Sequence, residues 1–366
     1  MRDDSLPPVE EVPAAHLEGR ELARGWTVGP RVTRDPSATG GFFSVSYTAR
    51  HEDGSLAFMK ALNFNAGATE TAPLVDQLNF FTSAYMFERD LLADCCDRKM
   101  GRVIRLLDHG EVTVAEAGPI LSKVPYLILE LAEGDIRTFQ ARAKDFDCAW
   151  AFRVMHHALL GLEQLHAAHT AHQDLKPSNV LTQSGGSEMK LGDLGRADRR
   201  GVNGPWSRNA IPGAVTYAPP EQQYGSFAGT WDERLAADLY LAGSLGVQLF
   251  LGNCMSALVQ AHLMAECTPQ QWAGSFDEVV PYLRSAHSEV ALALEQEVAE
   301  RVGDASSAQR YAAAVAQMTD PNPCERGHPK DRGARTSSYA VHRYVSLMDL
   351  LSARSHRLML EGSTRG

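Results

Sequence analysis

The stretch from Leu239 to Ala265 contains no Asp, Glu, Lys or Arg, and it constrains the fold more than any other part of the chain. Such a stretch must be buried, either across a bilayer or at the centre of a large domain. Gly252, followed by Asn, predicts that a helix ends in its middle, and the charged Arg234 and Asp238 stand just before it. We therefore predict a central core helix rather than a membrane span.

The composition allows such a core, since the chain has 366 residues and 44% of them are hydrophobic. That length suggests about two domains. The chain has 35 Lys and Arg against 45 Asp and Glu, and the net charge of −10 argues against a general nucleic-acid or anionic-membrane surface. The six cysteines are scattered without a C-x-x-C pair, and residues 1–25 lack the pattern of a secretory signal. We therefore expect a reduced, cytoplasmic protein that binds neither nucleic acid nor membrane.

Residues 1–36 are rich in Pro, Glu and Arg with little periodicity, so we predict an N-terminal extension there. Residues 37–131 are predicted to form a small lobe rich in strands. The strands are predicted from four short runs, at 42–48, 56–62, 103–107 and 126–131. The first two flank a Glu-Asp-Gly turn and predict a β-hairpin. Apolar residues at helical spacing over 74–95 predict one amphipathic helix in this lobe.

Farther along the chain the pattern becomes mainly helical, and we predict a second lobe over residues 132–327. A Ser-Gly-Gly-Ser turn at Ser184 predicts a short hairpin inside it. Residues 328–366 are predicted to be a C-terminal helical extension, because apolar residues recur at helical spacing from Tyr339 to Leu360. The predicted fold class is therefore α+β, with a small β-rich lobe followed by a larger α-helical lobe.

The residues with the clearest chemistry gather in one segment, which reads HQDLKPSN at 172–179 and GDLG at 192–195. It places two Asp, one Asn and one Lys around the predicted hairpin. Phosphoryl transfer needs a carboxylate near the attacking hydroxyl, oxygen ligands for Mg²⁺ and a cation that offsets developing negative charge. The ordered spacing H-x-D-x-K-x-x-N and D-x-G supplies all three, whereas a polar loop with an Asp-capped turn would not require that order.

This segment resembles the catalytic loop, H-R-D-L-K-x-x-N, and the metal-binding D-F-G turn of the eukaryotic-type protein kinase superfamily, in the style of bacterial Ser/Thr kinases. The resemblance implies that Asp174 is the catalytic base and that Lys176 contacts phosphate, as is typical of Ser/Thr kinases. It also implies that Asn179 and Asp193 bind Mg²⁺. Gln173 stands where the family has an arginine.

The strand-rich lobe carries further landmarks of the superfamily. Lys60 falls where the motif V-A-I-K ends the third strand. Glu88 lies on the apolar stripe of the predicted helix, where a carboxylate is tolerable if it meets a cation, so we predict a Lys60–Glu88 pair that holds the α- and β-phosphates. The hinge that would bind adenine is predicted at Glu130, Leu131 and Ala132. Asp135 is predicted to reach the ribose.

Downstream, residues 213–221 resemble the G-T-x-x-Y-x-A-P-E sequence that closes the activation segment, defined here as residues 193–221. The charge-free stretch then resembles the central helix of the superfamily, which starts at Asp238. Asp-Pro at 320–321 resembles the late D-P-x-x-R element, with its arginine displaced to Arg326. We therefore predict that Glu221 pairs with Arg326.

The glycine-rich loop of the superfamily is the landmark that this chain matches least. Thr39, Gly41 and Ser44 occupy its three glycine positions, so fewer backbone N–H groups can approach phosphate closely. Ser46 and Phe58 occupy the positions that usually present Val and Ala to adenine. These departures predict weaker or unusual nucleotide binding, and Phe58 is expected to crowd the adenine pocket.

The sequence predicts a protein kinase that uses ATP and Mg²⁺ to phosphorylate Ser or Thr hydroxyls of a protein substrate. A small-molecule kinase of the aminoglycoside type is an alternative, but Lys176 and Pro220-Glu221 count against it. A pseudokinase that serves as a nucleotide- or protein-binding module is favoured by the altered loop and opposed by the intact Lys60, Glu88, Asp174, Asn179 and Asp193. Nucleotidyl transfer is left open by the motifs.

Overall fold

The computed structural model describes residues 12–32, 44–63, 73–114, 122–332 and 337–363. The chain forms two compact units, Met1–Ala132 and Glu133–Gly366. The first is built around a β-sheet and the second is mainly helical, so the predicted α+β fold class is confirmed. The division falls one residue after the predicted boundary at Leu131.

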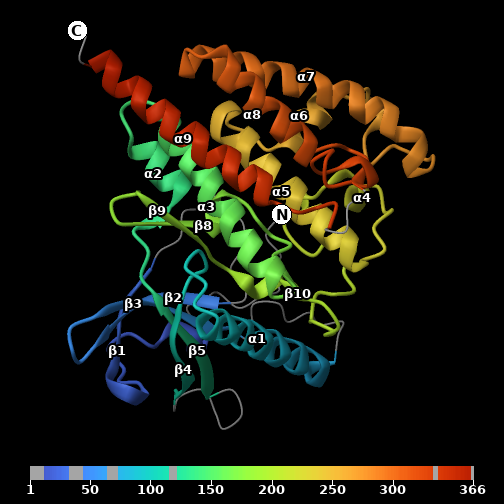
Figure 1. Cartoon of the computed structure of the whole chain (residues 1–366). Helices are drawn as coiled ribbons and strands as arrows, with labels where there is room; N and C mark the ends of the chain where they lie inside the picture. Colours follow the sequence, from blue (N-terminus) through green and yellow to red (C-terminus); the bar gives the residue numbers. More distant parts are fainter. Residues whose placement is uncertain (1–11, 33–43, 64–72, 115–121, 333–336, 364–366) are drawn as a thin grey trace. The chain divides into compact units, whose positions relative to one another are not determined.

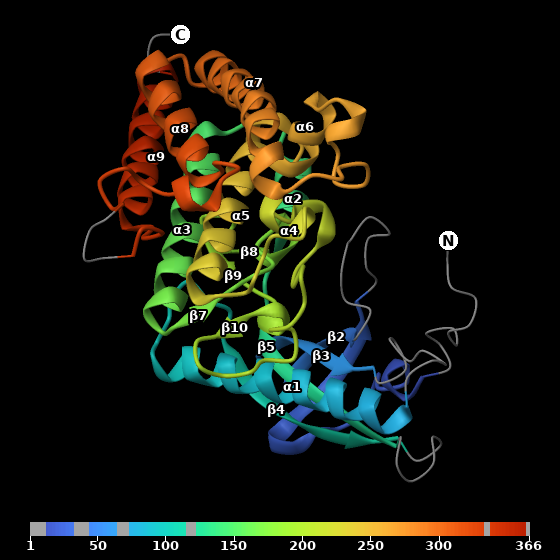
Figure 2. The same cartoon turned by 90° about the vertical axis from the view of Figure 1, so that its right-hand side faces the viewer.

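The sheet of the first unit has the strand order β1-β2-β3-β5-β4, and all neighbouring strands are antiparallel. The strands are β1 (Trp26–Arg31), β2 (Ser44–His51), β3 (Leu56–Leu62), β4 (Leu106–Thr113) and β5 (Lys123–Glu130). The long helix α1 (Leu74–Asp97) lies against β4 (Figure 1, Figure 2). The strand predicted at 103–107 is displaced, because Val103 and Ile104 are buried ahead of β4 rather than in it.

Strand β3 presents two different faces, because successive side chains alternate across a sheet. One face is fully buried in the core cluster of this unit, through Ala57, Met59 and Ala61. Phe58 and Lys60 lie on the opposite face. The strand register sets Ser46 directly beside Lys60 and Leu129 beside Phe58 on that face. The alternation of side chains along β3 and its register with β2 and β5 therefore determine which residues lie on the same face as Lys60.

The described residues before β2 belong to this unit, so the N-terminal extension predicted over 1–36 is wrong from Val12 onward. Strand β1 pairs with β2, and Val12 and Leu17 are buried in the same core cluster. The hydroxyl of Tyr47 donates a hydrogen bond to the carbonyl of Ala14 at 2.7 Å. Short 3₁₀ turns, together with Gly and Pro inside β1, interrupt the period-2 pattern that would have indicated a strand.

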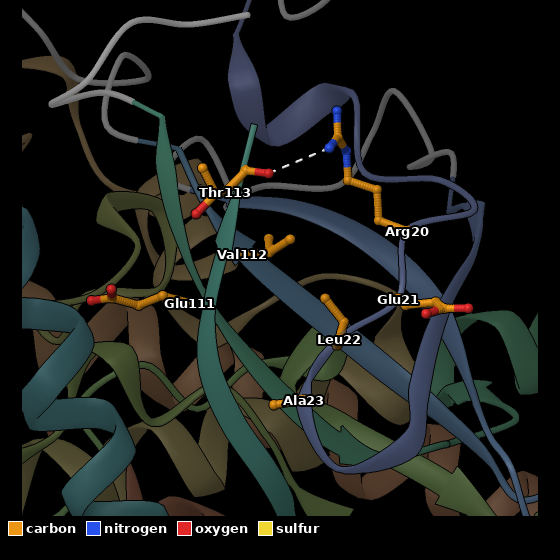
Figure 3. Close-up of a pocket in the computed structure, with 7 residues that line it drawn as sticks. All are labelled: Arg20, Glu21, Leu22, Ala23, Glu111, Val112 and Thr113. Carbon is orange, nitrogen blue, oxygen red and sulfur yellow. Dashed lines mark hydrogen bonds between the residues drawn. The ribbon is translucent and has the colours of Figure 1, made fainter. Parts of the chain in front are cut away.

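An open pocket of about 330 Å³ lies where this segment passes the end of β4 (Figure 3). Its walls are formed by Arg20, Glu21, Leu22, Ala23, Glu111, Val112 and Thr113. Arg20 reaches across it and donates a hydrogen bond to the carbonyl of Thr113 at 3.3 Å. None of these residues is a predicted site residue. The hydrogen bond from Arg20 instead attaches the N-terminal segment to the end of β4.

The second unit is built around one central helix. Its helices are α2 (Ile136–Arg142), α3 (Cys148–Ala167), α4 (Pro220–Gln223), α5 (Trp231–Leu251), α6 (Met255–His262), α7 (Phe276–Val302), α8 (Ala305–Met318) and α9 (His342–Ser363). A capping box of Thr230 and Glu233 begins α5, every residue over 234–247 is buried, and Gly252 ends the helix at a φ of 77°. The predicted core helix and its stop are confirmed, but the helix begins at Trp231 rather than at the predicted Asp238.

Among the described residues, no single helix has the length and apolar character needed to cross a membrane. Helices α5 and α6 pass that test only as a pair, and they are bent by 75° at the break between them.

The C-terminal helix α9 runs along α3 in both views (Figure 1, Figure 2). Its buried residues include Tyr344, Met348 and Leu351, so the predicted C-terminal extension packs onto this unit. Two small ladders complete the unit. One joins β6 (Gly134–Asp135), β8 (Val180–Gln183) and β9 (Glu188–Leu191), and the other joins β7 (Thr170–Ala171) and β10 (Asp198–Arg199). Strands β7 and β8 flank residues 172–179, the catalytic loop, and thereby position it.

Candidate active site

The carboxylate of Asp174 is held by three hydrogen bonds. Its Oδ2 accepts hydrogen bonds from Nζ of Lys176 at 2.8 Å and from Nδ2 of Asn179 at 3.1 Å. Its Oδ1 accepts one from the backbone N–H of Ala214 at 2.8 Å. Asp174 and Lys176 are both about 5% exposed. A carboxylate held in this way keeps one orientation, as a general base requires.

The backbone of the catalytic loop is held by Asp238 of α5. The carboxylate of Asp238 accepts hydrogen bonds from the N–H groups of His172 and Gln173, both at 2.7 Å, and from Nε2 of Gln173 at 3.0 Å. Gln173 has a φ of 63°, in the left-handed region that is unfavourable for a residue with a side chain. The bonds to Asp238 compensate for that strain and turn the loop so that Asp174 follows in place.

The hydrogen bonds and charges around Asp238 explain why its carboxylate stays ionised although it is buried. Asp238 is fully buried, which by itself raises the pKa of a carboxyl. Nε2 of His166 lies 2.8 Å from Oδ2, and this hydrogen bond, the charge of the nearby histidines and the N–H of Gln173 outweigh the burial. The pKa of Asp238 therefore lies below its ordinary value, and Asp238 remains a charged acceptor.

Asn179 and Asp193 lie at the two ends of the β8–β9 hairpin. The backbone N–H of Gly192 donates to the carbonyl of Asn179 at 2.9 Å, and the ring of His172 contacts the carbonyl of Gly192 at 3.2 Å. These bonds connect the turn that carries Asp193 to the catalytic loop. Asp193 is exposed and has a φ of 56°.

The donor atoms at this end of the hairpin suit Mg²⁺. Nδ2 of Asn179 donates to Asp174, whereas its Oδ1, which the hydroxyl of Ser178 approaches at 3.4 Å, is an available oxygen donor for a metal. Asp193 supplies a carboxylate. In the described part of the chain no group of three His, Cys, Asp or Glu residues could hold a metal by itself. Two oxygen ligands suit Mg²⁺ bound together with substrate phosphates, which is how this ion usually binds.

The end of the activation segment is anchored at two places. Gly213 approaches the loop so closely that a Cβ there would lie 2.3 Å from the carbonyl of Gln173, so only glycine fits. Glu221 and Arg326 form a buried bidentate pair at 2.8 and 2.9 Å, and the predicted pairing is confirmed. Arg326 also donates to the carbonyl of Ala236 at 2.9 Å, which connects this pair to α5.

In the first unit, Nζ of Lys60 lies 2.8 and 2.9 Å from the two carboxylate oxygens of Glu88 on α1. The predicted contact is confirmed, while its role in binding phosphates stays a prediction. Ser44 and Ser46 of β2 lie on the same face of the sheet, beside Leu62 and Lys60 respectively, and both serines are buried. Gly41 and Thr39 lie outside the described residues.

Phe58 shares the face of Lys60, two residues away along β3, as the sequence register requires. At the end of β5, the carboxylate of Glu130 accepts a hydrogen bond from the N–H of Arg105 at 2.8 Å. This bond holds the start of the predicted hinge, while Leu131 beyond it is exposed.

Asp135 acts as the N-cap of α2 and accepts hydrogen bonds from the N–H groups of Arg137 and Thr138 at 2.9 and 3.1 Å. It also forms an ion pair with Nη2 of Arg137 at 2.6 Å. The structure thus gives Asp135 a structural partner on its own helix, and its predicted contact with ribose stays a prediction.

A family model described as the protein kinase domain matches residues 40–289, well over half of the chain. The chain belongs to the protein kinase domain family. The match begins after β1 and ends inside α7, so the described residues before β2, and helices α8 and α9, lie outside it.

Several curated kinases are similar to this kinase domain. It is 25% identical over 237 residues to the probable serine/threonine-protein kinase PknB of Lactococcus lactis, a match that covers 64% of this chain and 35% of that protein. It is 28% identical over 250 residues to the serine/threonine-protein kinase PknL of Mycobacterium tuberculosis, covering 67% and 58%. It is 28% identical over 172 residues to Aurora/IPL1-related protein kinase 2 of Caenorhabditis elegans, covering 46% and 53%. The chain thus spans 35% to 58% of the length of these relatives.

Three residues of the kinase domain matter more than their sequence context indicates. Arg234 stands out in the sequence only as a charge ahead of the core helix, and Asp238 only as the residue where the resemblance to the superfamily's central helix starts, yet both are buried beside the catalytic loop. The context of Arg196 indicates a solvated part of the activation segment, but its guanidinium stacks 3.4 Å from the ring centre of Trp206. Burial lowers the pKa of Arg196, and the nearby carboxylates of Asp174 and Asp193 oppose that shift. For Arg234, a charge beside an apolar run is the sequence signal that could have indicated its burial.

Proposed function

We propose that this kinase domain transfers the γ-phosphoryl group of ATP to Ser or Thr hydroxyls of a protein substrate, with Mg²⁺ as the metal. The arrangement around Asp174 carries the proposal: a buried carboxylate with one oxygen held by Lys176 and Asn179 and the other by the N–H of Ala214. Such a carboxylate is suited to orient a hydroxyl and accept its proton, which is the task of the base in phosphoryl transfer.

Each remaining residue has a role that its position supports. Lys176, 2.8 Å from Asp174, brings a positive charge to the oxygens of the group being transferred. Asn179 and Asp193 would hold Mg²⁺, which when bound neutralises charge on the phosphates. Lys60, oriented by Glu88, contacts the α- and β-phosphates in this proposal.

Two observations support a polypeptide substrate with Ser or Thr. A pocket of about 340 Å³ adjoins Pro177 of the catalytic loop, and its other walls come from α2 and the end of α5. This pocket has room for a side chain and adjoins the loop that carries Asp174. The lysine two residues after the catalytic Asp resembles that of Ser/Thr kinases, and the printed names of PknB and PknL describe serine/threonine-protein kinases.

A second candidate, a pseudokinase that binds nucleotide or protein without transfer, is favoured by the residues around Lys60. Ser44, Ser46 and Phe58 differ from the usual residues of a nucleotide-binding sheet and lie on the face of Lys60. Against it stands the complete set of catalytic-loop contacts around Asp174.

The test is incubation of the full chain with Mg²⁺ and γ-labelled ATP in the presence of dephosphorylated casein, followed by phosphoamino-acid analysis. We expect label on Ser or Thr, and Asp174→Asn should lower the rate by about 10²- to 10⁴-fold, because an amide cannot accept the proton. The matched control is Asp145→Asn at an exposed aspartate, which should retain the rate.

Other outcomes identify the alternatives. Binding of Mg-ATP by calorimetry without any transfer would indicate a pseudokinase. Transfer to an aminoglycoside but not to casein would indicate a small-molecule kinase, and label transferred from α-labelled ATP would indicate nucleotidyl transfer. Asp193→Ala should weaken Mg-ATP binding, since a carboxylate ligand is lost.

A further inference from the structure

Arg234, in the first turns of α5, is 4% exposed and makes contacts that only a guanidinium can combine. Its Nη2 donates to the carbonyl of Ser207 at 2.6 Å, and its Nε donates to the carbonyl of Gly229 at 3.1 Å. Its Nη1 lies 3.5 Å from Oδ2 of Asp198, which is 6% exposed. A buried cation is stable only with partners of this kind, so Arg234 is held in one position.

Two of these partners belong to the activation segment. Asp198 lies on β10, which pairs with β7 immediately before the catalytic loop, and Ser207 lies farther along the segment. The carbonyl of Arg234 itself accepts a hydrogen bond from Nε2 of Gln173 at 2.9 Å. One residue therefore connects the activation segment, the central helix and the catalytic loop.

Helix α5 binds both the activation segment and the catalytic loop. Arg234 binds the activation segment, and Asp238, one turn later, binds the backbone of Gln173. Farther along, the segment is attached to the base itself, through the N–H of Ala214 and Oδ1 of Asp174. Loosening the segment at Arg234 would therefore loosen a hydrogen bond that orients the base.

The surroundings of Arg234 leave it unsuited to hold an added phosphate. Among the described residues, four buried polar atoms at this point have no hydrogen-bond partner: Gln173 Oε1, Asp198 Oδ2, Ser207 Oγ and Arg234 Nη1. All four are hidden from solvent, and the carboxylate of Asp198 already faces the guanidinium. A phosphate on Ser207 would place a second anion beside Asp198 away from water, which is unfavourable.

We propose that Arg234 is a positioning residue that anchors the activation segment from inside the fold, so that Asp174 is oriented without phosphorylation of the segment. This inference rests on the proposed function, because it concerns the regulation of the same site. The proposal also explains why Gln173 can replace the family's arginine. The cation that anchors the segment lies on α5, so the residue before Asp174 can be a neutral amide, which donates hydrogen bonds to α5.

The experiment compares the wild-type chain, Arg234→Met and Arg234→Lys, with Arg208→Met as a matched control at an exposed arginine of the same segment. Each protein is treated with phosphatase and checked by mass spectrometry. Casein phosphorylation then gives kcat and KM for ATP, and limited proteolysis reports cleavage within residues 198–214. Proteolysis needs no activity, so it tests the anchor even if the proposed function fails.

We expect the dephosphorylated wild type and Arg208→Met to keep their kcat. Arg234→Met should lose at least about tenfold in kcat with less than about twofold change in KM for ATP, and its segment should be cleaved about tenfold faster. Arg234→Lys should be intermediate in both, because an ammonium keeps the charge but lacks the fork that reaches two carbonyls. This variant also serves if Arg234→Met does not fold.

Three results would overturn the proposal. The first is loss of activity when the wild type is dephosphorylated, with recovery in Thr216→Glu, at the exposed threonine of the segment. The second is a wild-type kcat in Arg234→Met. The third is cleavage of the segment at the wild-type rate in both Arg234 variants, whatever the activity.

Discussion

In the helical unit, groups from separate parts of the chain donate hydrogen bonds to one carboxylate, that of Asp174. In the sheet unit, the comparable feature is the ion pair between Lys60 and Glu88. The helical unit thus holds Asp174 through a network of hydrogen bonds that extends into α5. The sheet unit holds Lys60 through Glu88 on one helix, α1, and through the register of one strand, β3.

Departures from the family pattern have different consequences in the two regions. Gln173 replaces an arginine, yet Asp238 and the carbonyl of Arg234 bind its side chain and keep the catalytic loop in shape. Ser46 and Phe58 lie on the face of Lys60 itself, where a substitution changes the surface beside Lys60. The hydrogen-bond network around the catalytic loop keeps its shape when Gln173 replaces an arginine. The register of β2 and β3 provides no such compensation and only determines on which face of the sheet a substituted side chain lies.

The largest expected effect concerns the buried pair that ties the activation segment to the helical unit. Arg326→Met should lower the free energy of unfolding by about 3–5 kcal/mol, because Glu221 is then left as an isolated buried charge. Urea denaturation measures this change. The control is Arg98→Met, which breaks the partly exposed pair with Asp94 and should cost about 0.5 kcal/mol or less. Equal losses in the two variants would contradict the importance of the network.

A pH effect of the next size is expected at His287, which is buried in α7 and lies 2.8 Å from the hydroxyl of Thr319. Burial lowers the pKa of His287 to about 4. Its contribution to stability is therefore complete above the ordinary histidine pKa of about 6.5 and is lost as the pH falls toward about 4, by about 3 kcal/mol in all. Urea denaturation between pH 7 and pH 4 measures it, and His287→Gln should flatten the slope. An unchanged slope in that variant would assign the pH dependence to other groups.

In the sheet unit, the effects of substituting Lys60 and Glu88 on activity should not be additive. Lys60→Met and Glu88→Gln should each lower casein phosphorylation, and the double variant should be little worse than the poorer single one, since either change breaks the same contact. We expect a coupling energy of about 1–3 kcal/mol in a double-mutant cycle of kcat/KM. Strictly additive losses would show that the contact does not contribute to catalysis.

The smallest expected effect is at Phe58, where a large ring lies on the same face of β3 as Lys60. Phe58→Ala should tighten ATP binding by about three- to tenfold, or admit bulkier N6-substituted analogues, because crowding at the adenine position is relieved. Calorimetry with ATP and one such analogue measures this. Unchanged affinity for both nucleotides would show that Phe58 does not face adenine, and the contrast between the two regions would then depend on Ser44 and Ser46 alone.

Local patterns in the amino-acid sequence are sufficient to predict much of this molecule. The alternation of β3 places Lys60 and Phe58 on one face, and the charge-free stretch with Gly252 gives the core helix and its end. A carboxylate on an apolar stripe predicts that Glu88 meets a cation, and the resemblance to protein kinases indicates Lys60 as that cation. These predictions hold because each depends on short-range periodicity or on the cost of burying one charge.

The N-terminal segment shows where local patterns fail. Strand β1 and the buried Val12 and Leu17 lack any period, because short turns and Gly29-Pro30 interrupt them. Their burial comes from pairing with β2 and from the core cluster that the whole sheet builds. Such packing depends on residues distant in sequence, which no window of neighbouring residues can reveal.

The sequence by itself determined the chemistry of this kinase domain: which carboxylates, amide and lysines are available, and in what order they follow one another. Only the tertiary structure decided that Asp238 and Arg234 lie beneath the catalytic loop and that the N–H of Ala214 reaches Asp174. The reason is physical. A buried charge is stable only where the fold brings partners to it, and here those partners come from segments that are tens of residues apart along the chain.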